Sequence, residues 1–253
     1  MDFKNEMLKR GDDPMVDLIY PAVRAFWREE RVLDQWNIGM ITNVWKGKGD
    51  REKMENQRGI TVSITVGTIP EEIINNRMTE VIEFTQAQAG GRKGACTADH
   101  IFIIRGIISL AKKLKRNIII TFYDVKKAYD RADVPDMMYI ASQNGFQGKI
   151  WRLAKILNED LSARVKTGHG LTRTLKQEKG GKQGGKLIVP LFAKMMDVLS
   201  EDMEKDESLG IKIDILEIPS LLYMDDVASI AEGYLQQQKT LDAVNEFGVK
   251  HQL

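Results

Sequence analysis

The stretch LLYMDDVASIAE, residues 221–232, places two adjacent aspartates, Asp225 and Asp226, between two apolar runs. Two like charges roughly 4 Å apart repel by about 4 kcal/mol at an effective dielectric constant of about 20. Water at a hairpin tip would screen that repulsion, and a bound cation would cancel it. The flanking apolar runs predict a β-hairpin with Met-Asp-Asp at its turn. The pair therefore indicates either a solvated turn or a metal site.

A third carboxylate, Asp124, follows a short apolar run that is typical of a buried central strand, NIIITFYDV at residues 117–125. A carboxylate at the end of a central strand is well placed for a functional site and poorly placed for a core. If this strand pairs with the hairpin, Asp124 meets Asp225 and Asp226 at one edge of the sheet. Mg²⁺ is commonly held by one or two carboxylates together with substrate phosphates. Two such ions about 4 Å apart support phosphoryl transfer, which is the chemistry that this pattern favours.

The composition is that of an ordinary globular protein. The chain has 253 residues, 43% hydrophobic and 29% charged, enough for one large domain or two intimate subdomains. A single cysteine, Cys96, excludes a disulfide framework and favours a reducing intracellular setting, either nucleus or cytoplasm. The sequence shows no secretory signal and no apolar run long enough to cross a bilayer, so we expect no membrane partner. The three histidines are widely separated, which argues against a His-rich zinc site.

The formal net charge of +1 conceals two basic tracts and one acidic tract. Residues 90–116 contain seven Lys or Arg against one acid, and residues 147–186 contain ten against three. Residues 197–226 reverse this balance, with ten acids against two lysines. Basic tracts are often solvated faces, but they are also what a phosphate backbone requires. Both interpretations remain open at this point.

Five motifs in the same order resemble those of the reverse transcriptases of non-LTR (LINE-type) retrotransposons. The residues that carry the resemblance are KGKGDREKMENQRGI (46–60), QAQAGGRKGACTADHIF (86–102), YDVKKAYDRA (123–132), GGKQGGKLIVPLF (180–192) and YMDD (223–226). One such motif would be a weak signal, but five in order over nearly the whole chain are specific. Two positions depart from the family pattern: Gly91 stands where the family has Phe, and Ile188-Val189 replace Ser-Pro.

The resemblance implies an α+β fold, the fingers and palm of a polymerase right hand, with an antiparallel palm sheet backed by helices. We expect a sequence that ends before the thumb. The implied domains are an N-terminal helical extension (1–35), the fingers (36–116) and the palm (117–253), which includes a loop and helix at 180–203 and the YMDD hairpin at 216–232.

The resemblance also implies the catalytic residues. Asp124 and Asp225 would be the principal ligands of two Mg²⁺ ions, for which Mn²⁺ could substitute. Asp226 would be a secondary ligand and the Val125 carbonyl an additional one. The implied reaction is the addition of deoxynucleotides to the 3′-OH of a DNA primer on an RNA template, with dNTPs as substrates.

The family pattern further assigns residues to the nucleotide and the nucleic acid. Tyr129, five residues after Asp124, would be a steric gate against the ribose 2′-OH, and plain core packing is the other interpretation. The triphosphate would be held by Lys46 and Arg58, although nearby Lys48 and Arg51 could be the true counterparts. The remaining assignments are Gln183 and Gly184 at the incoming nucleotide, and Arg92, Lys93 and Lys182 at the nucleic acid.

Two other functions compete with this prediction. Gly180, Gly185 and Lys186 fit a phosphate-loop pattern, but the next residue is Leu187, where Mg²⁺ binding requires Ser or Thr. The second alternative is a catalytically inactive, truncated or domesticated relative that binds RNA. Intact Asp124 and Asp225 argue against the loss of chemistry, and metal titration would separate the two possibilities.

Overall fold

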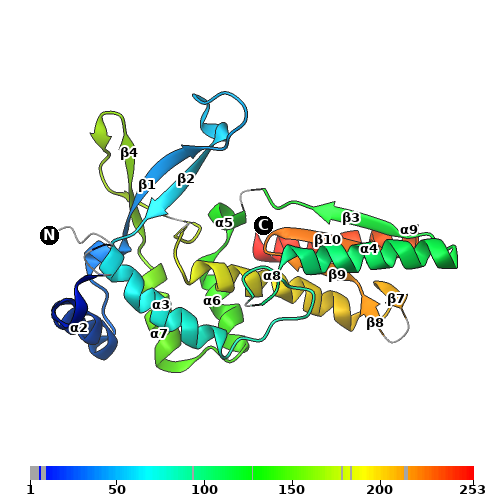
Figure 1. Ribbon diagram of the computed structural model, residues 1–253, viewed down its shortest axis with the longest axis horizontal. Helices are drawn as coiled ribbons and strands as arrows, with labels where there is room; N and C mark the ends of the chain where they lie inside the picture. Colours follow the sequence, from blue (N-terminus) through cyan, green and yellow to red (C-terminus); the bar gives the residue numbers. More distant parts are fainter. Residues whose placement is uncertain are drawn as a thin grey trace. The chain divides into compact units, whose positions relative to one another are not determined.

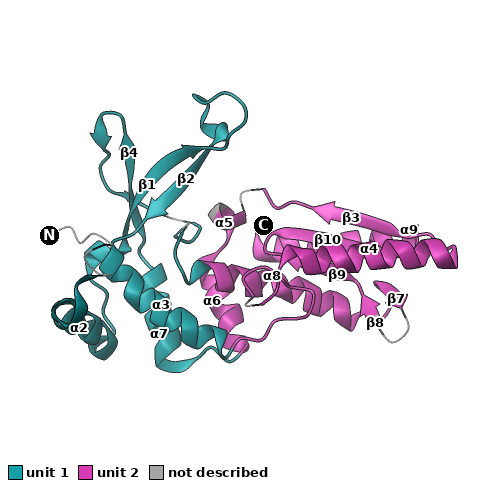
Figure 2. Cartoon of the chain, viewed as in Figure 1, with its two compact units in different colours: residues 1–81, 145–188 teal, residues 82–144, 189–253 magenta. Residues whose placement is uncertain are grey.

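The structure, a computed structural model, describes residues 6, 10–92, 94–126, 128–177, 179–182, 184–213 and 216–253. The chain forms two compact units, each built from two separate segments (Figure 2). Unit 1 contains Met1–Val81 and Gly145–Ile188, and unit 2 contains Ile82–Asn144 and Val189–Leu253. We describe each unit by itself.

Unit 1 combines a small mixed sheet with helices (Figure 1). The helices are α2 (Asp12–Glu29), α3 (Thr65–Thr79) and α7 (Gly148–Asn158), with the short 3₁₀ turns η1 (Asp34–Asn37) and η2 (Met54–Asn56). The strands are β1 (Ile38–Trp45), β2 (Gln57–Val62), β4 (Ser162–Thr167), β5 (Gly170–Leu171) and β6 (Leu175–Lys176). Strand β1 pairs antiparallel with β2 and parallel with β4.

The start of α3 shows tertiary packing overriding local propensity. The β-branched sequence after Arg58 predicts a strand through residue 67 and a helix only from residue 70. Instead α3 begins at Thr65. Gly67 packs against the Trp36 ring so closely that an added Cβ would lie 3.1 Å from its Cγ. In the helical conformation, Val66 and Gly67 of this segment are buried.

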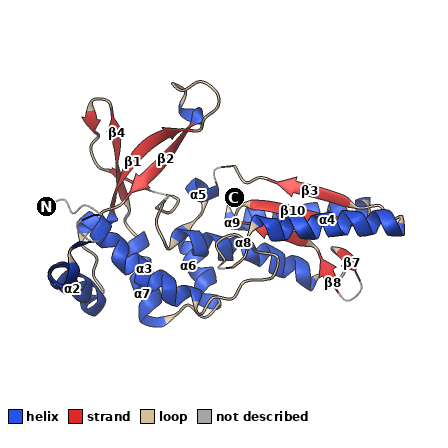
Figure 3. Cartoon of the chain, viewed as in Figure 1, coloured by secondary structure: helices blue, strands red, loops and turns tan. Residues whose placement is uncertain are grey.

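Unit 2 combines helices and strands (Figure 3), and it is built around a three-stranded antiparallel sheet in the order β3–β10–β9. The strands are β3 (Ile119–Tyr123), β9 (Ser220–Tyr223) and β10 (Asp226–Ala231), and a separate ribbon contains β7 (Ile211–Ile213) and β8 (Leu216–Ile218). The helices are α4 (Thr97–Leu114), α5 (Ala128–Arg131), α6 (Val134–Gln143), α8 (Ile188–Lys205) and α9 (Tyr234–His251).

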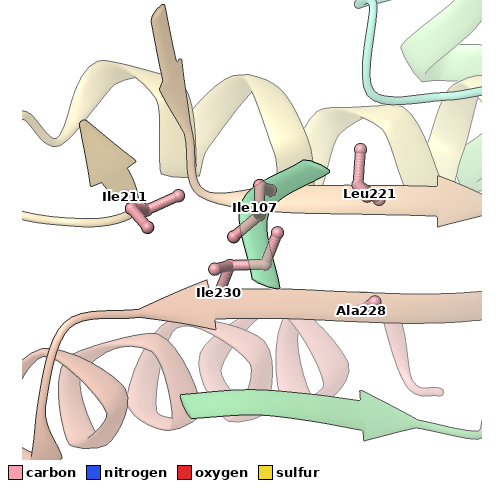
Figure 4. Packing of buried hydrophobic residues seen from close by; sticks show 5 residues of the cluster. All are labelled: Ile107, Ile211, Leu221, Ala228 and Ile230. Carbon is pink, nitrogen blue, oxygen red and sulfur yellow. The ribbon is translucent and has the colours of Figure 1, made fainter. Parts of the chain in front are cut away.

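Helices cover both faces of this sheet. On one face, Ile107 of α4 packs in a cluster with Ile211, Leu221, Ala228 and Ile230, as Figure 4 shows. On the other face, hydrogen bonds join the sheet to two helices: α8 through Ser200 to Ser220, and α9 through Gln237 to Tyr123 and Ser229. Because side chains alternate between faces along a strand, this three-layer arrangement fixes the register of the sheet.

The antiparallel sheet backed by helices confirms the predicted α+β palm architecture. The compact units follow different boundaries from the predicted fingers and palm: residues 82–116 belong to unit 2 and residues 145–188 to unit 1. The units are defined by contacts rather than by role, so the assignment of 36–116 to fingers and 117–253 to palm stays a prediction. Among the helices described, none combines the length and apolar character needed to cross a membrane.

Candidate active site

The YMDD sequence forms the tip of the β9–β10 hairpin, as predicted. Tyr223 pairs with Asp226, which leaves Met224 and Asp225 as a two-residue turn. Met224 has a φ of 60°, and a positive φ at the first central position alone is the pattern of a type II′ turn. Such a backbone conformation costs a non-glycine residue about 1–3 kcal/mol, and it persists only where surrounding contacts impose it. Asp225 is half-buried in the turn, and Asp226 is exposed.

Asp124 lies at the same end of the sheet as this turn. The β3–β10 register pairs Tyr123 with Val227, so the next position along places Asp124 opposite Asp226. Asp124 is exposed just beyond the last residue of β3, and the following Val125 is half-buried. Residues separated by a hundred positions in the chain are thereby brought to one edge, as the sequence predicts.

The donor set at this edge suits a hard divalent cation. All three side chains are carboxylates, and within the described chain no lysine or arginine forms an ion pair with Asp124 or Asp226. No group of three or more His, Cys, Asp or Glu residues in the described part forms a ready metal cage. Mg²⁺ usually relies on one or two carboxylates plus substrate phosphates rather than on an all-protein cage. Carboxylate oxygens are ligands of the kind that Mg²⁺ takes, so these residues fit a Mg²⁺ site only together with further ligands such as substrate phosphates.

Tyr129 lies beside these carboxylates. It belongs to α5, and its ring lies 4.8 Å from the ring of Phe192 on α8, centroid to centroid. Burial and, to a lesser extent, the negative charge of Asp225 together raise the pKa of the Tyr129 phenol to about 12. The phenol thus stays protonated at neutral pH, between an aromatic support and a carboxylate.

Gln88 and Gly90 also contact the hairpin turn, although the motif that contains them assigns neither a role. The Gln88 side chain is fully buried, and its Oε1 accepts the backbone N–H of Met224 at 3.2 Å. A Cβ on Gly90 would lie 2.3 Å from the Met224 nitrogen. The Q-x-G motif marks both residues, but nothing in the sequence shows which group Gln88 contacts.

Lys46 and Arg58 lie on the β1–β2 hairpin of unit 1, and both are exposed. Arg58 pairs with Val44, and the Lys46 N–H donates to the Asn56 carbonyl, which extends the same ladder by two residues. Alternation along the strands therefore places Lys46 and Arg58 on the same face of the hairpin. The Lys46 ammonium donates to the Glu55 carbonyl at 2.9 Å.

In the glycine-rich loop before α8, Lys182 is buried, although it is predicted to contact nucleic acid. Lys182 is 3% exposed, and its ammonium donates to Trp36 O, Asn37 Oδ1 and Glu71 Oε1 at 3.0, 3.4 and 3.2 Å. Burial lowers the pKa of Lys182, and the Glu71 charge opposes that shift. With all three ammonium hydrogens used inside unit 1, this placement contradicts the prediction that Lys182 contacts nucleic acid.

Gly184 in the same loop lies close to strand β2, and its contact with the incoming nucleotide stays a prediction. Its φ of 108° favours glycine, and a Cβ there would lie 3.0 Å from the Thr61 carbonyl oxygen. Gln183 lies outside the described residues. Helix α8 begins at Ile188, so Pro190 falls in its first turn, where proline is tolerated. The departure from Ser-Pro thus leaves a regular helix.

Arg92 is half-buried at the end of the loop that precedes α4. Its guanidinium donates to the Thr85 carbonyl and to Gln86 Oε1 at 3.1 and 3.3 Å. A guanidinium has five N–H donors, so these two bonds fix its position and leave further donors for a phosphate. Lys93, predicted beside it, lies outside the described residues.

Acidic residues at the hairpin end of a helix-backed antiparallel sheet are the arrangement that the resemblance to polymerases predicts. A family model for reverse transcriptase (RNA-dependent DNA polymerase) matches residues 46–253. The chain belongs to this family. The predicted enzyme class, RNA-directed DNA polymerases, is confirmed at the level of the family.

A curated relative places the chain near retrotransposons, as predicted. The chain is 23% identical over 209 residues to the retrovirus-related Pol polyprotein from type-1 retrotransposable element R2 of Popillia japonica. The match covers 82% of this chain and 29% of the relative, so the chain spans less than a third of that protein's length.

Solved structures with the same fold include yeast telomerases. The telomerase of Candida albicans, in complex with a fragment of telomeric RNA, aligns with a TM-score of 0.61 and 12% identity over 94% of this chain and 44% of its own. The Candida tropicalis enzyme in the corresponding complex aligns with a TM-score of 0.59 and 14% identity over 92% of this chain and 43% of its own. At these identities the likeness concerns the fold.

Proposed function

We propose that this chain catalyses templated addition of deoxynucleotides to a primer 3′-OH on RNA, with release of pyrophosphate. The observation that supports this most directly is the pairing of β3 with β10, which brings Asp124 to the turn that carries Asp225. Family membership supports the same reaction. The resemblance to an R2 element supports an origin in a mobile element.

Asp124, Asp225 and Asp226, with the Val125 carbonyl, would hold the metal. When bound, Mg²⁺ would activate the attacking hydroxyl and neutralise charge on the phosphates, and Mn²⁺ would substitute. The contribution of the chain is to position these oxygen ligands on a rigid sheet edge, so that substrate meets a preformed negative rim. A half-buried Asp225 in a strained turn supports this role.

Tyr129 would select the sugar. Its ring is supported by Phe192 and lies near Asp225, so a ribose 2′-OH at that position would collide with it. On unit 1, Lys46 and Arg58 would grip the triphosphate by charge-assisted hydrogen bonds. Gln183 and Gly184 would line the incoming nucleotide.

Arg92 and Lys93 would contact the nucleic acid, with an RNA template and a DNA primer as partners. The donors that remain on the Arg92 guanidinium support phosphate binding there. The telomerase of Candida albicans, which has the same fold, is described in complex with RNA.

Primer extension on an RNA template tests the proposal. Asp124→Asn and Asp225→Asn should each lower the extension rate by about 100-fold or more, because each removes an anionic metal ligand. Asp242→Asn, on the exposed face of α9, is the matched control and should leave the rate unchanged.

Extension that survives both substitutions would contradict the proposal. RNA binding without extension, unaffected by Asp225→Asn and by Mg²⁺ or Mn²⁺ titration, would instead support the non-catalytic, RNA-binding alternative.

A further inference from the structure

The loop before α4 is anchored at two places within unit 2. At its start, Asp197 of α8 accepts the N–H and the hydroxyl of Thr85 at 3.0 and 2.6 Å. Near its middle, Ala89 N–H donates to the Leu222 carbonyl at 2.9 Å, and Leu222 N–H donates to the Ala87 carbonyl at 2.8 Å. The second pair is a parallel bridge between residue 88 and β9. Residue 88 is therefore held against the strand that leads into the Met224–Asp225 turn.

Gln88 uses both ends of its side-chain amide at this place. Its Oε1 accepts Gly90 N–H at 2.8 Å and Met224 N–H at 3.2 Å, which fills both lone pairs. Its Nε2 donates to the Ala193 carbonyl of α8 at 3.3 Å. The side chain is 0% exposed, so no solvent competes for these bonds.

The Met224 N–H depends on this acceptor. In a two-residue turn closed by the Tyr223–Asp226 pair, the amide of the first central residue takes no part in the strand ladder. Its hydrogen bond to Gln88 supplies the missing partner at the residue that has the strained, positive φ. Gly90 completes the support, because its backbone packs where a Cβ would be 2.3 Å from the Met224 nitrogen and 2.6 Å from its Cγ.

We propose that Gln88 is a positioning residue that holds the Met224–Asp225 turn in the conformation that presents Asp225, with Gly90 permitting the close contact. The proposal rests on the proposed function, in which Asp225 is a metal ligand. Outer residues that orient metal ligands typically contribute 10- to 100-fold to metal affinity or activity. Gln88 acts through the backbone of the turn and touches no reacting atom.

Two variants remove the support by different routes. Gln88→Met keeps the side-chain length and removes the amide acceptor and donor. Gly90→Ala keeps Gln88 and introduces a clash with the turn. Ser200→Ala is the matched control, because it removes a different buried hydrogen bond, between α8 and β9, that does not involve the turn.

Amide hydrogen exchange measures the effect without requiring activity. Labelling with ¹⁵N-methionine restricts the spectrum to the methionine amides, and Met224→Leu identifies the signal of Met224. In Gln88→Met, exchange at Met224 should rise by roughly 5- to 30-fold, the factor for losing about one hydrogen bond, while Met224 in Ser200→Ala exchanges as in the wild type. Mn²⁺ affinity, titrated on the same samples, should fall by about 10- to 100-fold in Gln88→Met and Gly90→Ala.

Primer extension on RNA then separates positioning from general damage. We expect kcat to fall by about 10- to 100-fold in both variants with the KM for dNTP essentially unchanged, and the Ser200→Ala control to retain wild-type kcat. Unchanged Met224 exchange and unchanged Mn²⁺ affinity in both variants would overturn the positioning role, even if the wild type extends primers. A wild type that extends no primer, but whose Mn²⁺ affinity and Met224 protection fall with Gln88→Met, would uphold the positioning role and overturn the proposed function.

Discussion

At the scale of single residues, Tyr129 has the most specific predicted consequence. Its ring packs on the Phe192 ring, and the charge of Asp225 is close enough to raise the pKa of its phenol. Tyr129→Val should therefore open space for a ribose 2′-OH and raise the kcat/KM for ribonucleotides relative to deoxynucleotides. Tyr129→Phe keeps the ring and should keep the discrimination. Single-nucleotide incorporation kinetics measure both ratios, and an unchanged sugar preference in Tyr129→Val would refute the gate.

The Tyr129 phenol should also lose its proton at a higher pH than an ordinary tyrosine in the metal-free protein. Its pKa is raised from 10.0 to about 12 because burial and the Asp225 charge disfavour the phenolate. The folded state therefore holds this proton longer than the unfolded chain, and the stability that it contributes is present below pH 10 and lost between pH 10 and 12. The ultraviolet difference titration between wild type and Tyr129→Phe should have a midpoint near 12. A midpoint near 10 would show an exposed phenol.

The sequence indicates the acidic residues of the site but not the residues that support them. Asp124, Asp225 and Asp226 stand out because carboxylates after apolar strands have no place in a core. Gln88 gives no such signal, because its role depends on the Met224 amide, which lies 136 residues away. Lys182 misleads for the opposite reason: its glycine-rich basic loop predicts an exposed side chain, yet Glu71 neutralises it inside unit 1.

At the scale of elements, the Lys182–Glu71 pair connects the glycine-rich loop to α3. Both side chains are 4% exposed, and Glu71 also accepts the Lys186 N–H. Lys182→Met leaves a buried carboxylate without its cation and should lower the free energy of unfolding by about 3–5 kcal/mol.

A second substitution distinguishes the effect of the unpaired buried charge from the effect of lost side-chain packing. Adding Glu71→Leu to Lys182→Met should recover part of the loss, because no buried charge then remains. Lys186→Met removes the solvent-exposed pair with Glu72 and should change stability by less than about 1 kcal/mol. Chemical denaturation measures all three, and equal losses for Lys182→Met and Lys186→Met would contradict the buried pairing.

The packing of α4 on the palm sheet gives a further test on one element. Ile107 is 2% exposed against β9 and β10, so Ile107→Ala should lower stability by about 2–5 kcal/mol through the cavity left behind. Ile101 lies on the same helix but is 56% exposed, and Ile101→Ala should change stability by no more than about 0.5 kcal/mol. Chemical denaturation compares the free energies of unfolding of the two variants. Similar losses in both would mean that the face of α4 with Ile107 is not the one that packs on the sheet.

Most elements of the fold follow from sequence periodicity. The α4 helix, the β3 strand and the YMDD hairpin lie where apolar spacing predicts them. Two features do not follow. Pro21 predicts a helix that is kinked or split, and α2 is not split, because it runs as one helix from Asp12 to Glu29. Strand β7 is not predicted either, because the apolar–polar alternation of Ile211–Ile213 is too short a run to indicate a strand.

At the scale of the whole molecule, the uneven charge predicts how nucleic acid binding responds to salt. Neutralising Arg92 and Lys93 to Gln should reduce the slope of log K against log salt by roughly 0.7 for each single-strand phosphate that is no longer neutralised. Neutralising Lys112 and Lys113, exposed in the last turn of α4 within the same basic tract, is the matched control. RNA titrations over a range of salt measure the slopes, and the same reduction in both double variants would mean that only the overall charge matters.

The proposed reaction depends on residues of β3 and of the hairpin turn acting on one metal centre. The most direct measurement is the anomalous scattering of Mn²⁺ in crystals of the chain with an RNA–DNA primer–template and a non-hydrolysable deoxynucleotide. We predict a Mn²⁺ peak within coordination distance of both Asp124 and Asp225, absent from Asp225→Asn crystals. A separation of more than about 10 Å between the carboxyl groups of these two residues would contradict this mechanism. At that distance the two groups could not both bind ions that are spaced about 4 Å apart.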